Sequence, residues 1–580
     1  MDRLKIVRGI IYLVTLAIII RLVYWQFIAG VQSAPSQIKQ EGRIPAARGE
    51  IYTSDNFPIV ANQEAFILFT KPKEINIKPS DIATKVAPLL ISEKYSTMEA
   101  ELGEDELEKK NKEIEQQETS VIQKISEEKL FWVQLARKIT KQTKEKIESF
   151  NLSGIGFQQD TRRIYPESSM AAHLLGFVGS NQFGEDMGYF GLEGYYDNQL
   201  RGKDGRGGQI EDPLGLPILV AKFEPIPPKK GNSLYLSIDR GAQFIVEDRL
   251  RQAVEKYGVK QGVVIISDVK SGKILAMASS PTYIPNLFAE FTEDLYRNPA
   301  VADTYEPGST FKLITMASAL DQGLVEPNTK CTVCTGPRRI GGYEISTWNK
   351  KYYPNSTMVE VIQHSDNIGM TFVSQKLGIN KFVDYITRFG FGQKTGVDLQ
   401  DEASGVIRPV SDWKEIDLAT ASFGQGIAVT PIQMIQAVQA IANGGRLISP
   451  KIVNKIVSDD KKEIVKPEKD IQVISPKTAS QITEMMVNAV EQGEAKAFAP
   501  QGYRIAGKTG TAQIPVAGHY DSEKTIASFI GFAPADDPKF VMLISFTEPS
   551  SSVFGSETAA PTFFAIAKDL FNYWGISPRD

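Results

Sequence analysis

The stretch at residues 305–312, Tyr-Glu-Pro-Gly-Ser-Thr-Phe-Lys, constrains the fold more than any other part of the 580-residue chain. Pro307 and Gly308 interrupt regular backbone, and an unbroken helical pattern follows them. Ser309 is therefore expected at a helix start, where free backbone N–H groups favour developing negative charge. Lys312 follows on the same helical face. A serine beside a neutral amine is an activated nucleophile. The alternative is a capping serine before an exposed lysine.

Two further motifs follow in order along the chain. Ser365-Asp366-Asn367 lies between two helix-like runs, and Lys508-Thr509-Gly510-Thr511 lies in a strand-like run at residues 503–514. A second Lys-Thr-Gly, at residues 394–396, follows a glycine-rich loop and does not fit a strand. Ser-x-x-Lys, Ser-Asp-Asn and Lys-Thr-Gly together are typical of β-lactamases and penicillin-binding proteins.

The chain resembles a class B penicillin-binding protein, a monofunctional, membrane-anchored peptidoglycan D,D-transpeptidase of the division or elongation type. Blocks outside the three motifs carry the same resemblance. They lie at residues 48–51, 163–166, 176–179, 191–194, 423–426 and 528–534. The resemblance therefore covers nearly the whole length.

Length and composition agree with a folded protein of two or three domains. Hydrophobic residues make up 42% and charged residues 23% of the chain. The net charge of −4 gives no reason to expect nucleic acid as a partner.

The N-terminus carries an apolar run at residues 9–28, about the length that spans a bilayer as a helix. Arg3, Lys5 and Arg8 precede it, so the tip is expected in the cytoplasm and the bulk on the extracytoplasmic side of the cell membrane. The alternative is a signal peptide cleaved near residues 31–34.

Three segments are predicted. Residues 1–30 are expected to form the cytoplasmic tip and transmembrane anchor. Residues 31–230 are expected to form an elongated, β-rich, non-catalytic dimerisation or pedestal domain. Residues 231–580 are expected to form the penicillin-binding transpeptidase domain, because the proline-rich stretch at 224–231 is a stiff connection.

Two stretches of the N-terminal module stand out. The charged run at residues 101–118 predicts a helix, and Leu107, Ile114 and Val121 recur every seven residues as a narrow apolar seam. A solvated insertion and a partner-binding helix are both open. The glycine-rich residues 201–208 predict a flexible loop, with a phosphate-cradling loop as the alternative.

The C-terminal part predicts an α+β fold in which helices cover an antiparallel sheet. Strands are expected at 234–239, 262–268, 274–278, 525–532 and 540–546, and helices from 239 to about 257 and at 560–573. The resemblance implies the same architecture, the serine β-lactamase-like fold.

The resemblance also implies roles for the motif residues. Ser309 would attack the penultimate D-alanine of a stem peptide, and Lys312 would be the base. Lys508 would be the cation that lowers the pKa of Lys312. Ser365 would relay a proton to the leaving group, and Asn367 would bind the substrate backbone.

The resemblance implies that Thr509 and Thr511 hold the substrate carboxylate, and Gly510, which lacks a Cβ, would let the substrate lie close along the strand. The resemblance also implies that backbone N–H groups of Ser309 and Thr511 form the oxyanion hole. No metal or organic cofactor is suggested.

Four other residues carry separate expectations. Cys331 and Cys334 are the only cysteines, and a local disulfide or two free thiols are both open, since three histidines make a zinc site hard to complete. His364, beside Ser365, is interpreted as structural or as lining the rim. Glu494 is an atypical residue in a block that otherwise resembles the family.

Alternative functions are a D,D-carboxypeptidase, a β-lactam-hydrolysing or β-lactam-sensing protein, and a non-enzymatic regulator of a membrane glycosyltransferase. Asp401 and Glu402 are the acids nearest in motif order, and they are interpreted as solvated turn residues. The expected partners are peptidoglycan stem peptides, β-lactams, a polytopic membrane glycan polymerase and divisome or elongasome proteins. The choice between division and elongation, the acceptor cross-bridge, the envelope type and the oligomeric state stay open.

Overall fold

A computed structural model describes residues 2–24, 38–95, 104–127, 129–211, 226–459, 461–516 and 519–578. The chain divides into two compact units. One comprises Met1–Ala47 and Gly202–Gly231, and the other comprises Arg48–Arg201 and Asn232–Asp580. Each unit is therefore built from two separate stretches of sequence.

The smaller unit contains helix α1 (Asp2–Val23) and a two-stranded antiparallel ladder. Strand β1 (Ile38–Ile44) pairs with β8 (Gly205–Glu211) along its whole length. The prediction of a flexible loop at residues 201–208 is therefore wrong from Gly205 onward. A strand ladder uses only backbone N–H and C=O groups, which glycine also has, so a glycine-rich stretch can pair when a partner strand is present.

The segment predicted to span a bilayer, residues 9–28, begins inside α1 and continues beyond residue 24 into the part that the structure does not describe. The alternative cleavage region at residues 31–34 also lies outside the described residues. No helix among the described residues has both the length and the apolar character needed to cross a membrane.

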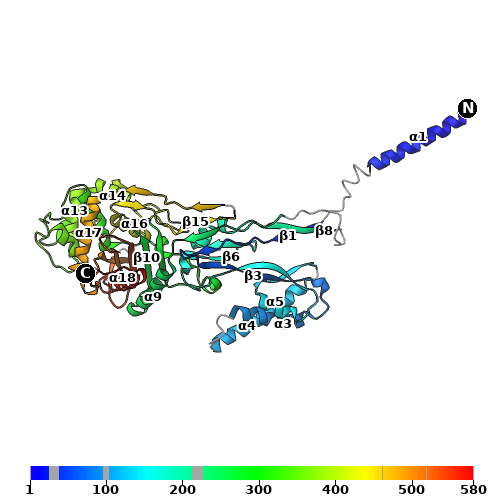
Figure 1. Cartoon of the computed structure of the whole chain (residues 1–580), viewed down its shortest axis with the longest axis horizontal. Coiled ribbons are helices and arrows are strands. Elements are labelled where there is room, and N and C mark those ends of the chain that lie inside the picture. Colours follow the sequence, from blue (N-terminus) through cyan, green and yellow to red (C-terminus); the bar gives the residue numbers. More distant parts are fainter. Residues whose placement is uncertain are drawn as a thin grey trace. The chain divides into compact units, whose positions relative to one another are not determined.

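The larger unit contains a five-stranded antiparallel sheet in the order β11-β10-β20-β19-β18, of which β10 is labelled in Figure 1. All four neighbouring pairs are antiparallel, as the sequence predicted for this part of the chain. The strands are β10 (Gln261–Asp268), β11 (Ile274–Ser280), β18 (Ala506–Val516), β19 (His519–Ala533) and β20 (Phe540–Thr547). Strand β18, which carries the Lys-Thr-Gly motif, lies at the edge of this sheet.

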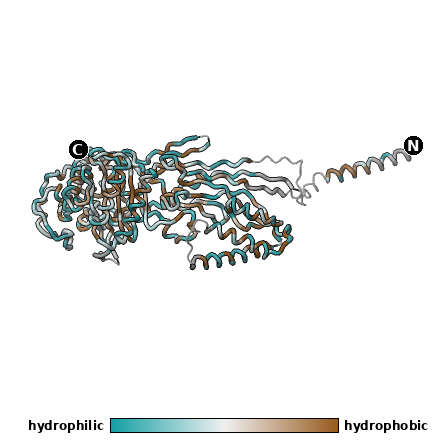
Figure 2. The backbone as a smooth tube through the Cα atoms, turned by 60° about the horizontal axis from the view of Figure 1, so that its bottom comes forward, coloured by the Kyte–Doolittle hydropathy of each residue, from teal (hydrophilic) through white to brown (hydrophobic). Residues whose placement is uncertain are grey.

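Helices bury both faces of this sheet. Phe529 packs with α9 (Arg240–Tyr257) and α18 (Ala559–Trp574), whereas its neighbour Ile530 belongs to the core on the opposite face. That second core includes α11 (Lys312–Asp321), α16 (Pro431–Ala442) and α17 (Pro476–Glu491). Hydrophobic segments accordingly concentrate inside this part of the chain (Figure 2). Burial on both faces explains why the central strands β10 and β20 are nearly continuous apolar runs.

A second sheet, also in the larger unit, has the order β16-β15-β9-β2-β3-β4, and β5 also pairs with β3. Its strands are β2 (Ile51–Tyr52), β3 (Pro58–Thr70), β4 (Val133–Ile139), β5 (Ile155–Ile164), β9 (Ser233–Leu236), β15 (Val453–Val457) and β16 (Lys462–Ile464). Strand β9 pairs with β2 and with β15. The sheet therefore joins strands from both sides of residue 231.

Helices α3 (Pro79–Tyr95), α4 (Glu104–Ile125) and α5 (Lys141–Glu148) form a small core with β3 (Figure 1). The helix predicted in the charged run at residues 101–118 is confirmed as α4 from residue 104, where the described part of that run begins. The predicted seam holds only toward its C-terminal end, because Val121 is fully buried while Leu107 is 45% exposed.

Three of the blocks that carry the family resemblance meet in a buried ionic cluster. Arg48 Nε donates to Glu193 Oε2 (2.7 Å), and Arg163 Nε donates to Glu193 Oε1 (2.6 Å). Arg48 Nη1 also donates to Asp197 Oδ1 (2.8 Å). Glu193 is fully buried, and the two arginines supply the positive charges that a buried carboxylate needs.

Shorter elements complete the larger unit. In its first half they are α6 (Ala172–Leu175), β6 (Phe177–Ser180), β7 (Asp186–Tyr189), α7 (Gly191–Tyr195), α8 (Asp197–Leu200) and α10 (Pro299–Ala302). Later in the chain they are β12 (Arg338–Ile340), β13 (Tyr343–Ile345), α12 (Met358–Gln363), α13 (Asn367–Leu377), α14 (Ile379–Arg388), α15 (Glu415–Ala421), β14 (Arg446–Ile448) and β17 (Asp470–Gln472).

Candidate active site

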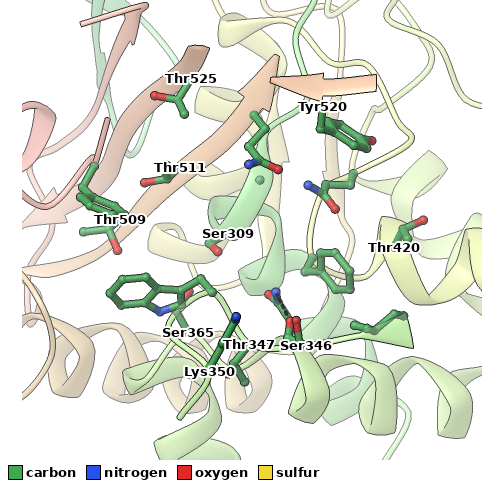
Figure 3. Close-up of a pocket in the computed structure, with 18 of the residues that line it drawn as sticks. Ser309, Ser346, Thr347, Lys350, Ser365, Thr420, Thr509, Thr511, Tyr520 and Thr525 are labelled. Carbon is green, nitrogen blue, oxygen red and sulfur yellow. Dashed lines mark hydrogen bonds between the residues drawn. The ribbon is translucent and has the colours of Figure 1, made fainter. Parts of the chain in front are cut away.

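A pocket of about 780 Å³ lies where the start of α11 meets the edge strand β18. Side chains from all three sequence motifs line it, and Figure 3 shows Ser309 between the β18 threonines and Ser365. The motif residues in its wall are Ser309, Ser365, Asn367, Thr509 and Thr511. The structure therefore brings together residues that are as far apart in sequence as Ser309 and Thr511.

Ser309 lies in a short 3₁₀ turn, η5 (Gly308–Phe311), that leads directly into α11. Gly308 has φ +56°, and a Cβ atom there would come within 3.1 Å of the carbonyl oxygen of Thr511. Glycine therefore permits both the turn and the close approach of the helix start to β18. As a result, the turn that carries Ser309 packs closely against the backbone of Thr511.

Lys312 is fully buried and its amine contacts the second motif. Its Nζ donates to the carbonyl oxygen of Ser365 (2.6 Å), to Ser365 Oγ (3.1 Å) and to Asn367 Oδ1 (2.8 Å). Burial holds the pKa of Lys312 well below its ordinary value, and repulsion from Lys508 lowers it further. Asp366 and Glu494 act in the opposite direction and raise the pKa of Lys312.

The second motif lies in the turn between α12 and α13. Ser365 has a positive φ of 54°, and Asp366 caps α13 by accepting a hydrogen bond from the N–H of Ile368 (2.8 Å). Asn367 Nδ2 donates to the carbonyl oxygen of Ser346 (3.2 Å), a bond that is drawn in Figure 3. The cap and this bond fix the turn, so Ser365 and Asn367 both face the amine of Lys312.

Lys508 is 3% exposed and lies beneath the pocket wall. Its Nζ donates to the backbone oxygen and to Oγ1 of Thr509, both at 3.1 Å. Burial lowers the pKa of Lys508, and Glu494 opposes that shift. Thr509 and Thr511 both line the pocket, as the alternation of a strand predicts. Thr511 Oγ1 accepts a hydrogen bond from the N–H of Gly555 (3.1 Å).

Gly510 was predicted to leave room for a substrate, but the space that its missing Cβ would fill is taken by the protein itself. A Cβ atom at Gly510 would lie 2.3 Å from Ser528 Oγ and 2.9 Å from Thr310 Cγ2. Both neighbours belong to the protein, on β19 and in the turn η5. Glycine at this position is therefore required by internal packing.

Several lining residues were missed by reasoning from sequence. Tyr520 OH donates to Glu306, at 3.3 Å from each carboxylate oxygen, and the rings of Trp348 and Phe554 lie 5.5 Å apart. The remaining polar and charged ones include Glu344, Lys350, Gln425, Gln513 and Thr525. They come from loops and from strands β13, β18 and β19. Two of the lining residues had a signal in the sequence: Gln425 lies in the family block at residues 423–426, and Glu494 departs from its family block.

Other residues considered from sequence lie away from the pocket. The second Lys-Thr-Gly, at residues 394–396, is in a loop, and Thr395 donates to the buried carboxylate of Glu402. Glu402 is thus a buried structural acid, so its interpretation as a solvated turn residue is wrong. His364 stacks on Tyr353 with a centroid separation of 4.0 Å.

The two cysteines, Cys331 and Cys334, form a disulfide, which settles the alternative between a local bridge and free thiols. Among the described residues, no group of three or more His, Cys, Asp and Glu side chains has an arrangement that could hold a metal ion.

Comparisons with known proteins agree with this geometry. Residues 262–570 match the penicillin-binding protein transpeptidase domain, and residues 43–236 match the penicillin-binding protein dimerisation domain. The chain is 34% identical over 575 residues to stage V sporulation protein D of Bacillus subtilis, covering 98% of this chain and 85% of that protein. It is 31% identical over 449 residues to the peptidoglycan D,D-transpeptidase FtsI of Escherichia coli, covering 77% of this chain and 73% of that protein.

A solved structure of similar fold is penicillin-binding protein 3 from Mycobacterium tuberculosis in complex with aztreonam. It has a TM-score of 0.69 at 25% identity and covers 93% of this chain and 98% of that one. The two domain matches, the relatives above 30% identity and the shared fold all indicate the same family. The chain therefore belongs to the class B penicillin-binding proteins, and it is a serine D,D-transpeptidase with a non-catalytic N-terminal module.

Proposed function

We propose that Ser309 is the nucleophile of a D,D-transpeptidase that cross-links peptidoglycan stem peptides, and that β-lactams acylate the same serine. The observation that carries this proposal is the position of Lys312. Its buried amine lies one helical turn after Ser309 and contacts Ser365 and Asn367 of the second motif. Because burial disfavours the protonated form, the pKa of Lys312 lies well below that of an ordinary lysine, and its amine is suited to accept a proton.

In the first half-reaction, Ser309 Oγ attacks the carbonyl carbon of the penultimate D-alanine and its proton passes to Lys312 Nζ. Backbone N–H groups of Ser309 and Thr511 hold the oxyanion. The C–N bond to the terminal D-alanine then breaks, and the leaving nitrogen receives a proton through Ser365. The product is an ester between Ser309 and the shortened stem peptide.

In the second half-reaction, the amine of another stem peptide attacks that ester. A new amide bond forms, the bond to Ser309 Oγ breaks, and the proton lost by the amine returns to the serine through Lys312. A neutral lysine keeps two N–H donors and one lone pair. It can therefore stay bonded to Asn367 while exchanging a proton with Ser365 or Ser309.

The decisive experiment is covalent labelling of the Ser309→Ala variant with a fluorescent penicillin. We expect no labelling of the variant at any time and stable labelling of the unaltered protein. Circular dichroism should give the same melting curve for both, because alanine keeps the Cβ of Ser309 and removes only its hydroxyl oxygen. A labelled Ser309→Ala protein would remove this serine from the mechanism.

Product analysis with a donor and an acceptor stem peptide separates transfer to an amine from transfer to water. We expect a cross-linked dimer together with free D-alanine. Free D-alanine without any dimer would instead identify a D,D-carboxypeptidase, which uses the same acyl-enzyme.

We also propose a place in the cell and a division of labour along the chain. Residues 1–30 would anchor the protein in the cell membrane with a cytoplasmic tip, and residues 31–230 would act as a dimerisation or pedestal domain. Residues 231–580 would then carry the transpeptidase on the extracytoplasmic side. A polytopic membrane glycan polymerase and other division or elongation proteins would be the partners.

The anchor has a simple test. Deleting residues 1–30 should release the protein from membranes and leave penicillin binding intact, because every proposed active-site residue lies beyond residue 231. A mature natural protein that begins after residue 33 would show a cleaved signal peptide instead.

A further inference from the structure

Glu494 places a carboxylate on the part of the pocket where a ligand carboxylate is expected. It follows the C-terminal end of α17, lines the pocket and is exposed to solvent. Its Oε2 accepts a hydrogen bond from Thr509 Oγ1 at 3.2 Å. Thr509 is one of the two threonines to which the proposed function assigns the substrate carboxylate.

The hydroxyl of Thr509 has no second proton to offer. A threonine hydroxyl carries one O–H donor, and Lys508 Nζ already donates to the oxygen of this hydroxyl at 3.1 Å. In this arrangement the proton of Thr509 points to Glu494. An incoming carboxylate can accept the same proton only after Glu494 has been displaced.

Charge adds to this competition for the proton of Thr509. Two ionised carboxylates cannot hydrogen-bond each other, and like charges at such separations repel even where water screens them. The charged residues in the pocket wall are Glu344, Lys350 and Glu494, and of these Glu494 contacts Thr509. The pocket wall therefore already contains an internal carboxylate at the position where a ligand needs to place its own.

We propose that Glu494 is a specificity-determining residue that competes with the carboxylate of an incoming ligand for the hydroxyl of Thr509. This inference rests on the proposed function, because it takes Thr509 as a carboxylate-binding residue. A long stem peptide can offset the competition through further contacts along the edge strand β18. A small β-lactam has fewer such contacts, so Glu494 discriminates against small anionic acylating agents.

The test compares acylation by benzylpenicillin, which carries a carboxylate, with acylation by its methyl ester, which does not. Second-order rate constants are measured by mass spectrometry for the unaltered protein, Glu494→Gln and the control Glu344→Gln. Glutamine keeps the size of the side chain and removes its charge. Glu344 lines the same pocket, and within the described part of the chain Thr509 Oγ1 donates to Glu494 and not to Glu344.

The readout is the ratio of the two rate constants. Glu494 also raises the pKa of the buried base Lys312, and that effect is common to both reactions, so it cancels in the ratio. Glu494 raises the pKa of Lys508 too, so Glu494→Gln favours the neutral form of Lys508, which attracts a carboxylate less strongly and therefore opposes the expected gain. We expect Glu494→Gln to accelerate benzylpenicillin about tenfold relative to the ester, and Glu344→Gln to change the ratio less than about twofold. The tenfold gain should shrink when salt is raised from about 0.05 to about 0.5 M.

Each contrary result has a distinct meaning. An unchanged ratio in Glu494→Gln, with both reactions faster or slower by the same factor, overturns the inference and leaves Glu494 acting through the lysines. Slower hydrolysis of the acyl-enzyme in this variant, with no change in the ratio, would identify a water-activating base instead. No acylation of the unaltered protein by either compound would refute the proposed function itself.

Discussion

Replacing Lys508 by methionine should move the acidic limb of the acylation profile to higher pH. Lys312 has to be neutral to accept the proton of Ser309, so acylation slows as the pH falls through the pKa of Lys312. Lys508 lowers that pKa by repulsion between two buried amines. Removing its charge therefore raises the pKa of Lys312. Methionine has a similar length and no charge, so it fills the same buried space.

The size of the shift follows from the groups around Lys312. A charge close to a buried site moves a pKa by roughly one to three units. Burial lowers the pKa of Lys312 more than Lys508 does, so the lower end of that general range applies to the loss of Lys508. A rise of one unit in the pKa of Lys312 corresponds to about 1.4 kcal/mol. At a pH on the acidic limb, the variant should therefore be acylated about tenfold more slowly than the unaltered protein.

The assay is stopped-flow measurement of acylation by a fluorescent penicillin across a pH series. The midpoint of the limb is read separately from the plateau, because the loss of Lys508 Nζ also leaves Thr509 without one donor. Lys394→Met, in the second Lys-Thr-Gly, should leave the midpoint unchanged. If the acidic limb of Lys508→Met has the same midpoint as that of the unaltered protein, Lys508 does not lower the pKa of Lys312.

Three further outcomes are expected. Glu193→Ala leaves Arg48 and Arg163 buried without their shared carboxylate, so it should lower the free energy of unfolding by about 3–5 kcal/mol. A denaturant titration measures this loss, and a loss smaller than about 1 kcal/mol would contradict a stabilising role for the buried ionic cluster. Gly510→Ala should cost about 1–3 kcal/mol because its Cβ meets Ser528 Oγ, and adding Ser528→Ala should restore part of that loss, which calorimetry can measure. The penicilloyl-enzyme should persist for hours as a mass shift of one drug molecule, whereas rapid turnover of excess penicillin would favour a β-lactamase.

The sequence predicted the catalytic sheet well because its strands have a strong local pattern. Residues 262–268 and 540–546 are apolar runs bounded by turns, and they form β10 and β20 with nearly the predicted bounds. The helix start at Ser309 was predictable for a similar reason, since Pro307 and Gly308 mark it. In each case short-range rules decide the structure.

Long-range pairing was the part that local rules missed. Strand β8 is rich in glycine and forms because β1 supplies a full backbone ladder for it. Glu402 reads as a turn residue, yet it is buried against the backbone of Thr395. The contact between Glu494 and Thr509 depends on how α17 packs beside β18, which no local pattern encodes.

The burial of two lysines links catalysis to the stability of the fold. Because the pKa values of Lys312 and Lys508 are lowered on folding, the unfolded chain binds more protons than the folded chain between the folded-state pKa and the ordinary value of 10.5. The cost to stability is therefore complete below the folded-state pKa values and declines as the pH rises toward 10.5. The desolvation that keeps Lys312 able to accept a proton is the same desolvation that destabilises the fold. It follows that Lys508→Met should be at least as stable as the unaltered protein at neutral pH, so slower acylation of this variant reflects a lost charge and not a damaged fold.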